Sequence, residues 1–453
     1  MIGLIAQGAS WSNTQNLHPA GVMMLALASI ALFMVKRRHA LLPIIFIAMF
    51  VTTAQRAVIG GLDFPFLRVL IMLGWMRVFM LGETRRFKMI ALDWFTIYWG
   101  VGFFIANSIR DGLVIYSCGW MIDNLGAYFL FRILLRSREE MYESIKYAAL
   151  LAIPVAVAFV FEKVTRYNMF SVFGGVNEIT WLRQGKLRCM GSFSHPILAG
   201  CFFAGLLPLI GTLWKKSTES KRGRMLCAAG MVSAMTVVIC CASSTPLMAA
   251  VAGICALVLF AQHKSVPLLR YATLFGLFVL HFFVMEKPVW HLIARIDLTG
   301  GSTGYHRYRL IQATIDRFSE WWLIGTTDTA HWGHHLFDTT GHFVNQCTDG
   351  GLFSFLMFCG MLFFAFRAVG RVIKYSPEPA DKWLVWAVGA GLFANCVSFI
   401  GVSYFGKPLV LFLIQMAMLG SLEVAAKRDR YPVLATARRP LRRAGSAKLG
   451  TTN

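Results

Sequence analysis

The chain has 453 residues, of which 57% are hydrophobic and 15% are charged, and its mean hydropathy is +0.60. A soluble domain carries about 25% charged residues, so this composition excludes a soluble globular protein. The formal net charge of +22 would also suit a nucleic-acid-binding surface, but the basic residues stand in clusters between apolar runs. Clusters on alternate loops are what the positive-inside rule predicts for a membrane protein that contacts anionic lipids.

Apolar runs recur from Pro19 to Val424, and at about 17–22 residues each is long enough to cross a bilayer core of about 30 Å as a helix. An open sheet could not satisfy its backbone in lipid. We therefore predict an all-α polytopic membrane protein of about 12–13 transmembrane helices in one membrane domain, residues 1–424. The predicted spans are 19–35, 40–54, 67–82, 89–106, 114–135, 144–161, 192–213, 225–241, 246–262, 266–285, 351–370, 383–402 and 408–424.

The basic clusters orient this chain. Alternation of the loops places the cluster 215–224 and the basic tail, residues 425–453, in the cytoplasm, and we expect the tail to be disordered. The first apolar run has no basic segment before it, so we do not expect a cleaved signal peptide. The expected location is a bacterial inner membrane, crossed many times, with the C-terminus cytoplasmic.

Two long loops are predicted on the outer, periplasmic face, at 162–194 and 286–350. Both are rich in Arg, Lys or His, against the bias that orients the chain. A loop of this length can be translocated regardless of its charge. The alternative is that these cations bind an anionic ligand on the outer face.

The second loop contains a predicted amphipathic helix from Tyr308 to Trp322. Its apolar face is spaced by four, three and four residues and consists of Ile311, Ile315, Phe318 and Trp322. Such a helix lies on the bilayer surface or packs on its own protein. Either arrangement brings Arg307 and Arg309 near the membrane surface.

Two of the ten cysteines, Cys189 and Cys347, lie in the predicted outer loops. An oxidising periplasm would permit a disulfide between them, and two free thiols are the alternative. The sequence has no Walker A motif, no H-E-x-x-H and no D-x-D, so ATP-driven transport and metal-dependent chemistry lack their usual signatures. We expect neither a metal nor a cofactor.

A transporter would use paired ionisable residues near the middle of the membrane. Asp123, in the predicted span 114–135, is the best candidate, with Arg77 or Arg132 as its partner. A structural buried pair explains the same residues equally well. Transport of a lipid-linked glycan or an anionic solute therefore remains an alternative function.

Three blocks of sequence, all on the predicted outer face, carry a more specific pattern. The first leads from a basic loop into a transmembrane helix and contains Arg188, Gly191, Phe193, His195, Pro196 and Ala199. The second contains Ser302, Gly304 and Arg307, with Trp322 and Gly325 at its end. The third is polar, runs from Asp338 to Gly351, and re-enters the membrane at its two glycines. In this order the blocks resemble the O-antigen ligase and Wzy-type polysaccharide polymerase superfamily.

The resemblance implies a GT-C-like, metal-independent glycosyltransferase. Such an enzyme moves or polymerises a glycan from undecaprenyl pyrophosphate onto a glycan or lipid acceptor at the periplasmic face. Its partners are the donor, the acceptor and membrane lipids, with no nucleic acid. Arg188 and Arg307 match the family's two arginines, Arg309 is an alternate, and Arg68 is a further candidate for the pyrophosphate. Arginine suits this role because its guanidinium binds phosphate oxygens bidentately and stays charged.

The chain departs from the family at the catalytic base. The family places a histidine followed by an asparagine shortly before the closing glycine, whereas Thr340 and Gly341 stand at that spacing here. The base is open among three nearby residues, namely His342, Asp338 and His335. We rank His342 first because imidazole titrates near neutrality. We expect His195, Gly191 and Gly351 to have structural roles near the site.

Overall fold

The computed structural model of the protein describes residues 14–84, 87–216, 221–295 and 304–437. The predictions for Ser302 and for residues 438–453 of the tail lie outside the described residues. The described chain is almost entirely helical, with two short hairpins. It is an all-α polytopic membrane protein, as its composition predicts.

Eight described helices are long and apolar enough to cross a membrane. Two of them, α11 and α12, continue into a 3-10 turn and a π-helical turn respectively. The eight begin with α8 (Arg138–Thr165), α9 (Pro196–Lys216), α10 (Lys221–Cys240), α11 (Ser244–Val258) with η4 (Leu259–Gln262), and α12 (Val266–Val279) with η5 (Leu280–Val284). They end with α15 (His342–Tyr375), α16 (Pro379–Gly401) and α17 (Lys407–Ala437).

The first five predicted spans are also helical, but most are shorter or interrupted. They are α2 (Pro19–Met34), α3 (Leu42–Phe50), α4 (Phe66–Met80), α5 (Ala91–Asp111), and α6 (Val114–Met121) joined by the π-helical η2 (Ile122–Gly126) to α7 (Ala127–Leu134). At 1.5 Å per residue α3 is only about 14 Å long, so it cannot cross the bilayer core by itself. By length and composition the described chain therefore has fewer spans than we predicted.

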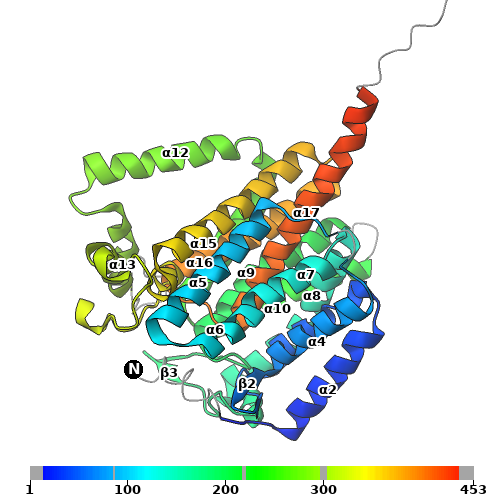
Figure 1. Ribbon diagram of the computed structural model, residues 1–453, viewed down its shortest axis with the longest axis horizontal. Coiled ribbons are helices and arrows are strands. Elements are labelled where there is room, and N and C mark those ends of the chain that lie inside the picture. The colour runs from blue at the N-terminus through cyan, green and yellow to red at the C-terminus, as the bar shows by residue number, and fades with distance from the viewer. Residues whose placement is uncertain (1–13, 85–86, 217–220, 296–303, 438–453) are drawn as a thin grey trace, which may run out of the picture.

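The bundle has two distinct ends (Figure 1). The loop end carries the hairpin of β1 (Arg56–Ile59) and β2 (Leu62–Pro65), the hairpin of β3 (Leu182–Arg183) and β4 (Lys186–Leu187), and the loop helix α13 (Gly304–Asp316). The opposite tail end carries the end of α17. There an ion pair of 3.0 Å between Arg138 and Asp381 joins the starts of α8 and α16. The described parts of the two predicted outer loops thus lie at one end, and the end of α17 lies at the other.

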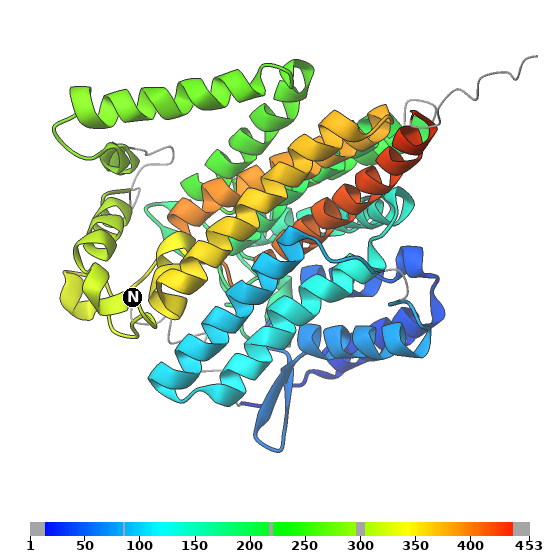
Figure 2. The ribbon, with the colours of Figure 1, turned by 45° about the horizontal axis from the view of Figure 1, so that its top comes forward.

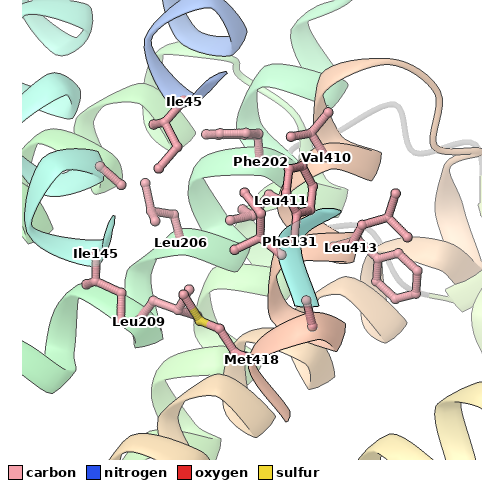
Figure 3. Close-up of a cluster of buried hydrophobic side chains, with 14 of the residues drawn as sticks. Ile45, Phe131, Ile145, Phe202, Leu206, Leu209, Val410, Leu411, Leu413 and Met418 are labelled. Carbon is pink, nitrogen blue, oxygen red and sulfur yellow. The ribbon is translucent and has the colours of Figure 1, made fainter. Parts of the chain in front are cut away.

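Helices α9 and α17 form the centre of the bundle. In the most apolar stretch of α9, 89% of the residues are buried inside the protein. Phe202 and Leu206 of α9 pack against Val410 and Leu411 of α17 (Figure 3). Apolar side chains are solvated by lipid as well as by each other. Close packing between side chains is therefore what holds membrane helices together. Figure 2 shows α15 beside α5, with which it packs over much of its length.

Helix α12 stands apart from the bundle (Figures 1 and 2). None of the residues in its most apolar stretch is buried inside the protein, and Phe275 and Phe283 are 69% and 76% exposed. A helix with apolar side chains all round suits a lipid environment. The segment after α12 nevertheless returns to the loop end and leads into α13.

The predicted loop helix differs from the observed one. The observed helix α13 starts at Gly304 and ends before Arg317, after which the chain continues as the short helix α14 (Phe318–Trp321). The face turned toward the protein holds Arg307, Leu310, Thr314 and Trp321. On the predicted apolar face, Ile315 and Trp322 are 49% and 47% exposed. The break rotates Trp321 inward, where its indole N–H donates to the Thr314 carbonyl at 2.7 Å.

The expectation of a disordered tail from residue 425 is wrong for its first part. Helix α17 continues through residue 425 to Ala437. Arg371 and Lys427 both pair with the buried Glu423 near this point, so packing against α15 extends the helix beyond its apolar stretch.

Candidate functional site

The first family-like block is held in place by the end of α8. The carboxylate of Glu162 accepts hydrogen bonds from the backbone N–H groups of Met190 (3.0 Å) and Gly191 (2.9 Å). The ammonium of Lys407, at the start of α17, donates to the carbonyl and hydroxyl oxygens of Ser192 at 2.6 and 2.8 Å. Because both partners are buried, these bonds fix the backbone that follows Arg188.

Gly191 and His195 both make contacts that shape the backbone of this block. Gly191 has φ +53°, and a Cβ atom there would lie 2.3 Å from the ring of Phe159. The Nδ1 of His195 accepts the N–H of Ile197 at 3.1 Å, at the start of α9. Burial, and then the charges of Arg188 and Arg183, lower the pKa of His195 to about 3. His195 is therefore a neutral cap and not a proton donor at physiological pH.

Arg188 and Arg307 stand out among the buried arginines. Arg56, Arg77 and Arg132 are buried beside Asp63, Glu83 and Asp93 respectively. Arg188 and Arg307 are each 7% exposed, yet neither pairs with a carboxylate in the part of the chain that the structure describes. The Nε of each has no hydrogen-bond partner among the described residues, which is also true of Arg56 and Arg77, so the missing carboxylate is what distinguishes Arg188 and Arg307. A buried cation without a counter-ion is costly, so these two residues indicate an anionic ligand.

Both arginines lie near the turn that joins α10 to α11. The N–H of Cys189, next to Arg188, donates to the Cys240 carbonyl at 3.1 Å. Nη2 of Arg307 donates to Oγ1 of Thr245 at 3.1 Å. A Cβ atom on Gly401, at the end of α16, would lie 3.0 Å from Cζ of Arg307. Because Gly401 has no side chain, the guanidinium of Arg307 can lie against the end of α16.

The start of α11 adds a favourable electric field. Its N-cap, Ser243, makes no side-chain capping hydrogen bond, and Ser244 and Thr245 are buried. The N-terminus of a helix carries partial positive charge and free N–H groups, which favour phosphate and other anions. We name Arg188, Arg307, Thr245 and the start of α11 the two-arginine site.

Burial lowers the pKa of both arginines. For Arg188 the charge of Arg183 contributes further, and for Arg307 the lowering by burial and by Arg183 outweighs an opposite effect of Cys201. Both guanidinium groups remain charged at neutral pH because their ordinary pKa exceeds 12. The lowered pKa values express the unfavourable energy of holding these cations without an anion.

The two other arginines that we predicted for the site lie elsewhere. Arg309 points toward Gly333, where a Cβ atom would lie 2.7 Å from its Nη2, and so faces away from Thr245. Arg68 forms a two-pronged ion pair with Asp123 at 2.9 and 2.7 Å. Its guanidinium is already occupied, so the structure does not favour Arg68 as a phosphate ligand.

The three candidate bases have very different surroundings. His342, which we ranked first, is 2% exposed, and its Nδ1 accepts the N–H of Tyr404 at 3.2 Å. Its ring packs against Phe399 and Phe358. This ring is part of the helix-packing core and is shielded from any acceptor. We therefore withdraw it as the preferred base.

Asp338 is better placed. Its carbonyl oxygen lies 3.3 Å from Nε2 of His306, the neighbour of Arg307. Its side chain is half-buried, and burial raises its pKa. His335 is exposed, has φ +61° and packs on His334, so nothing directs it toward the arginines. Of the three candidates, Asp338 is the one whose main chain contacts the neighbour of Arg307.

The third block ends in a kink of α15. Gly351 has φ +68°, and a Cβ atom there would lie 2.6 Å from the Leu323 carbonyl oxygen. Just before the kink, Asn345 donates to the Asp349 carboxylate at 2.5 Å. Arg110 donates to the Thr348 carbonyl at 2.8 Å. The glycine therefore lets the chain after α14 approach α15 closely, as a structural role near the site requires.

Sequence reasoning missed Thr245 and the start of α11. The signal was present as the run Ser243, Ser244, Thr245 and Pro246, since Ser and Thr before a Pro are typical of a helix start. Nothing in that run indicates that Arg307, from a distant loop, reaches it.

The structure corrects the ion pair considered for a transporter, and for Cys189 and Cys347 it shows the alternative of two free thiols. Asp123 pairs with Arg68, and not with Arg77 or Arg132. Cys189 and Cys347 are both free thiols. Cys347 packs in a separate small core with Trp321 and Trp332, whereas Cys189 lies against α10.

Comparison with known proteins adds no assignment. The sequence matches no protein-family model and no curated protein.

Proposed function

We propose that the protein is a membrane glycosyltransferase of the O-antigen ligase and polysaccharide polymerase type. It would transfer or polymerise a glycan carried on a polyprenyl diphosphate, with the loop end on the periplasmic side of a bacterial inner membrane. The observation that carries the proposal is a pair of buried arginines without a carboxylate partner among the described residues. Arg307 bonds Thr245 at the start of α11, and the residue after Arg188 bonds Cys240 at the end of α10. A bound diphosphate would supply the negative charge that no described carboxylate provides to these two arginines.

The chemistry follows from this charge distribution. An acceptor hydroxyl attacks the anomeric carbon of the glycan, and the bond from that carbon to the diphosphate oxygen breaks. The diphosphate leaves with additional negative charge, so Arg188 and Arg307 would stabilise the transition state more than the bound donor. Asp338 would accept the proton of the attacking hydroxyl.

The orientation rests on the charge of the connections. The basic connections and the tail gather at the tail end, and the positive-inside rule assigns that end to the cytoplasm. The two-arginine site then faces the periplasm. The pairing of Asp123 with Arg68 neutralises the one acid that we considered for a transporter, and so gives no support to transport.

A transfer assay tests the proposal. The full chain, purified and reconstituted in vesicles, is given a lipid-linked oligosaccharide with a diphosphate bridge, and glycan products are separated by size. We expect transferred or lengthened glycan, and equal activity with and without a chelator. If glycan only crosses the vesicle membrane and its linkage stays intact, the protein is a transporter.

A further inference from the structure

The hairpin that precedes Arg188 carries a line of cations. Its strands pair Leu182 with Leu187 and Arg183 with Lys186. The next step of this register is closed by the N–H of Arg188, which donates to the Trp181 carbonyl at 3.1 Å. Residues directly opposite each other, and residues two apart on one strand, share a face. Arg183 and Arg188 therefore lie on the same face, and the leucines lie on the other.

The turn of this hairpin makes the register well defined. Gln184 and Gly185 have φ values of +51° and +72°, as a two-residue turn with two left-handed residues requires. Glycine adopts this conformation without strain. A slip by one residue would move Arg183 to the opposite face, so the turn fixes the position of this cation.

Arg183 also acts on both members of the two-arginine site. Its charge contributes, after burial, to the lowered pKa of Arg188 and of His195, and it lowers that of Arg307 as well. These effects agree with the hairpin register, which places Arg183 on the same face as Arg188. Arg183 itself is exposed, and its side chain forms no ion pair or hydrogen bond with any residue that the structure describes. It is available to a ligand that enters from the surface.

We propose that Arg183 is a third anion-binding residue, which extends the two-arginine site outward by one phosphoryl group and selects a diphosphate over a monophosphate. This inference rests on the proposed function. A lipid-linked diphosphate diester carries two negative charges and gains another when the glycan leaves. Three arginines match that final charge, and an exposed arginine at the outer edge can follow the departing group into solvent.

The affinities of two probes test this inference. Farnesyl diphosphate and farnesyl monophosphate are titrated into the purified full chain in detergent, and each dissociation constant is measured by calorimetry. We expect Arg183→Ala to weaken diphosphate binding about 10–150-fold, the usual effect of losing a hydrogen bond to a charged group, and to leave monophosphate binding unchanged. Arg183→Gln should act in the same way, which protects the result against misfolding of one variant.

The matched control is Arg295→Ala. Arg295 is also an exposed arginine at the loop end, so its loss changes the net charge equally. It should leave the ratio of the two affinities as in the wild type. Equal weakening of both probes by Arg183→Ala, or no weakening of either, would overturn the inference alone, provided that Arg188→Ala and Arg307→Ala abolish binding. If those two variants bind both probes normally, the two-arginine site is wrong and the inference is wrong with it.

Discussion

Nη2 of Arg307 donates to Oγ1 of Thr245 across 3.1 Å, and this hydrogen bond joins the loop helix α13 to the first turn of the membrane helix α11. The contact decides which of two nearby arginines belongs to the site. Arg309 is only two residues away but lies about 200° around the helix, against Gly333. Two arginines that are close in the sequence, Arg307 and Arg309, therefore have different surroundings in the fold.

Replacement of Arg307 by Ala should abolish glycan transfer, whereas Arg309→Ala should change it little. Loss of one charged contact to the leaving group costs about 2–4 kcal/mol, which is roughly a thirty- to thousand-fold loss in rate. Arg188→Ala should behave like Arg307→Ala. Lysine should rescue either position only in part, because a point charge replaces the planar fork. The rates are measured on a lipid-linked oligosaccharide, with protein levels in the membrane checked by immunoblot. Equal loss in the Arg307 and Arg309 variants would contradict the assigned faces of α13.

Asp338→Asn should reduce transfer by about 10²–10⁴-fold, the usual contribution of a general base. The wild-type enzyme should also lose activity in acid. Burial raises the pKa of Asp338, and the base acts when ionised, so activity rises as the pH increases through a value above the ordinary 3.9 or so of aspartate. A pH–rate profile measures this limb, which should vanish in the Asn variant. His335→Gln is the control and should keep the wild-type profile. A normal rate in Asp338→Asn would show that another group takes the proton.

Gly191→Ala should destabilise the folded protein far more than Gly185→Ala. Both glycines have positive φ, so each alanine variant bears backbone strain of about 1 kcal/mol. Only at position 191 would the new methyl group also meet a ring, at 2.3 Å from Phe159, whereas nothing lies within 4 Å at Gly185. Overpacking adds about 1–3 kcal/mol. Thermal unfolding in detergent should show a clearly lower Tm for Gly191→Ala. Similar Tm values for the two variants would mean that the first block is not held as tightly as its contacts indicate.

Reporter fusions should place the two ends of α12 on opposite sides of the membrane. A fusion after Lys264 should report the cytoplasm and one after Trp290 the periplasm, because α12 and η5 together span the bilayer between them. Paired reporters, one active on each side, provide the internal control. Cytoplasmic reporter activity at Trp290 would overturn the orientation and with it the outer location of the site.

Much of the fold could be predicted from hydropathy, because a membrane helix must be apolar over a defined length. Every predicted span contains a helix, and the most buried of them, α9, follows directly from the first block. Boundaries were weaker where packing overrides local pattern. The loop helix breaks at Arg317, and the break lets Trp321 form a buried hydrogen bond to Thr314. Helix α17 continues past its apolar stretch, where Glu423 pairs with Arg371 and Lys427.

The sequence by itself determined that Arg188 and Arg307 are candidates, since the blocks that contain them resemble a family with two arginines at these positions. Only the tertiary structure decided which cations lack a partner. Arg68 is neutralised by Asp123, 55 residues away, and His342 is enclosed by the ends of other helices. Pairing and burial depend on contacts between distant segments, which the spacing of residues along the chain does not contain. For that reason the sequence could name candidate residues, and the packing of α9, α11, α13 and α16 selected among them.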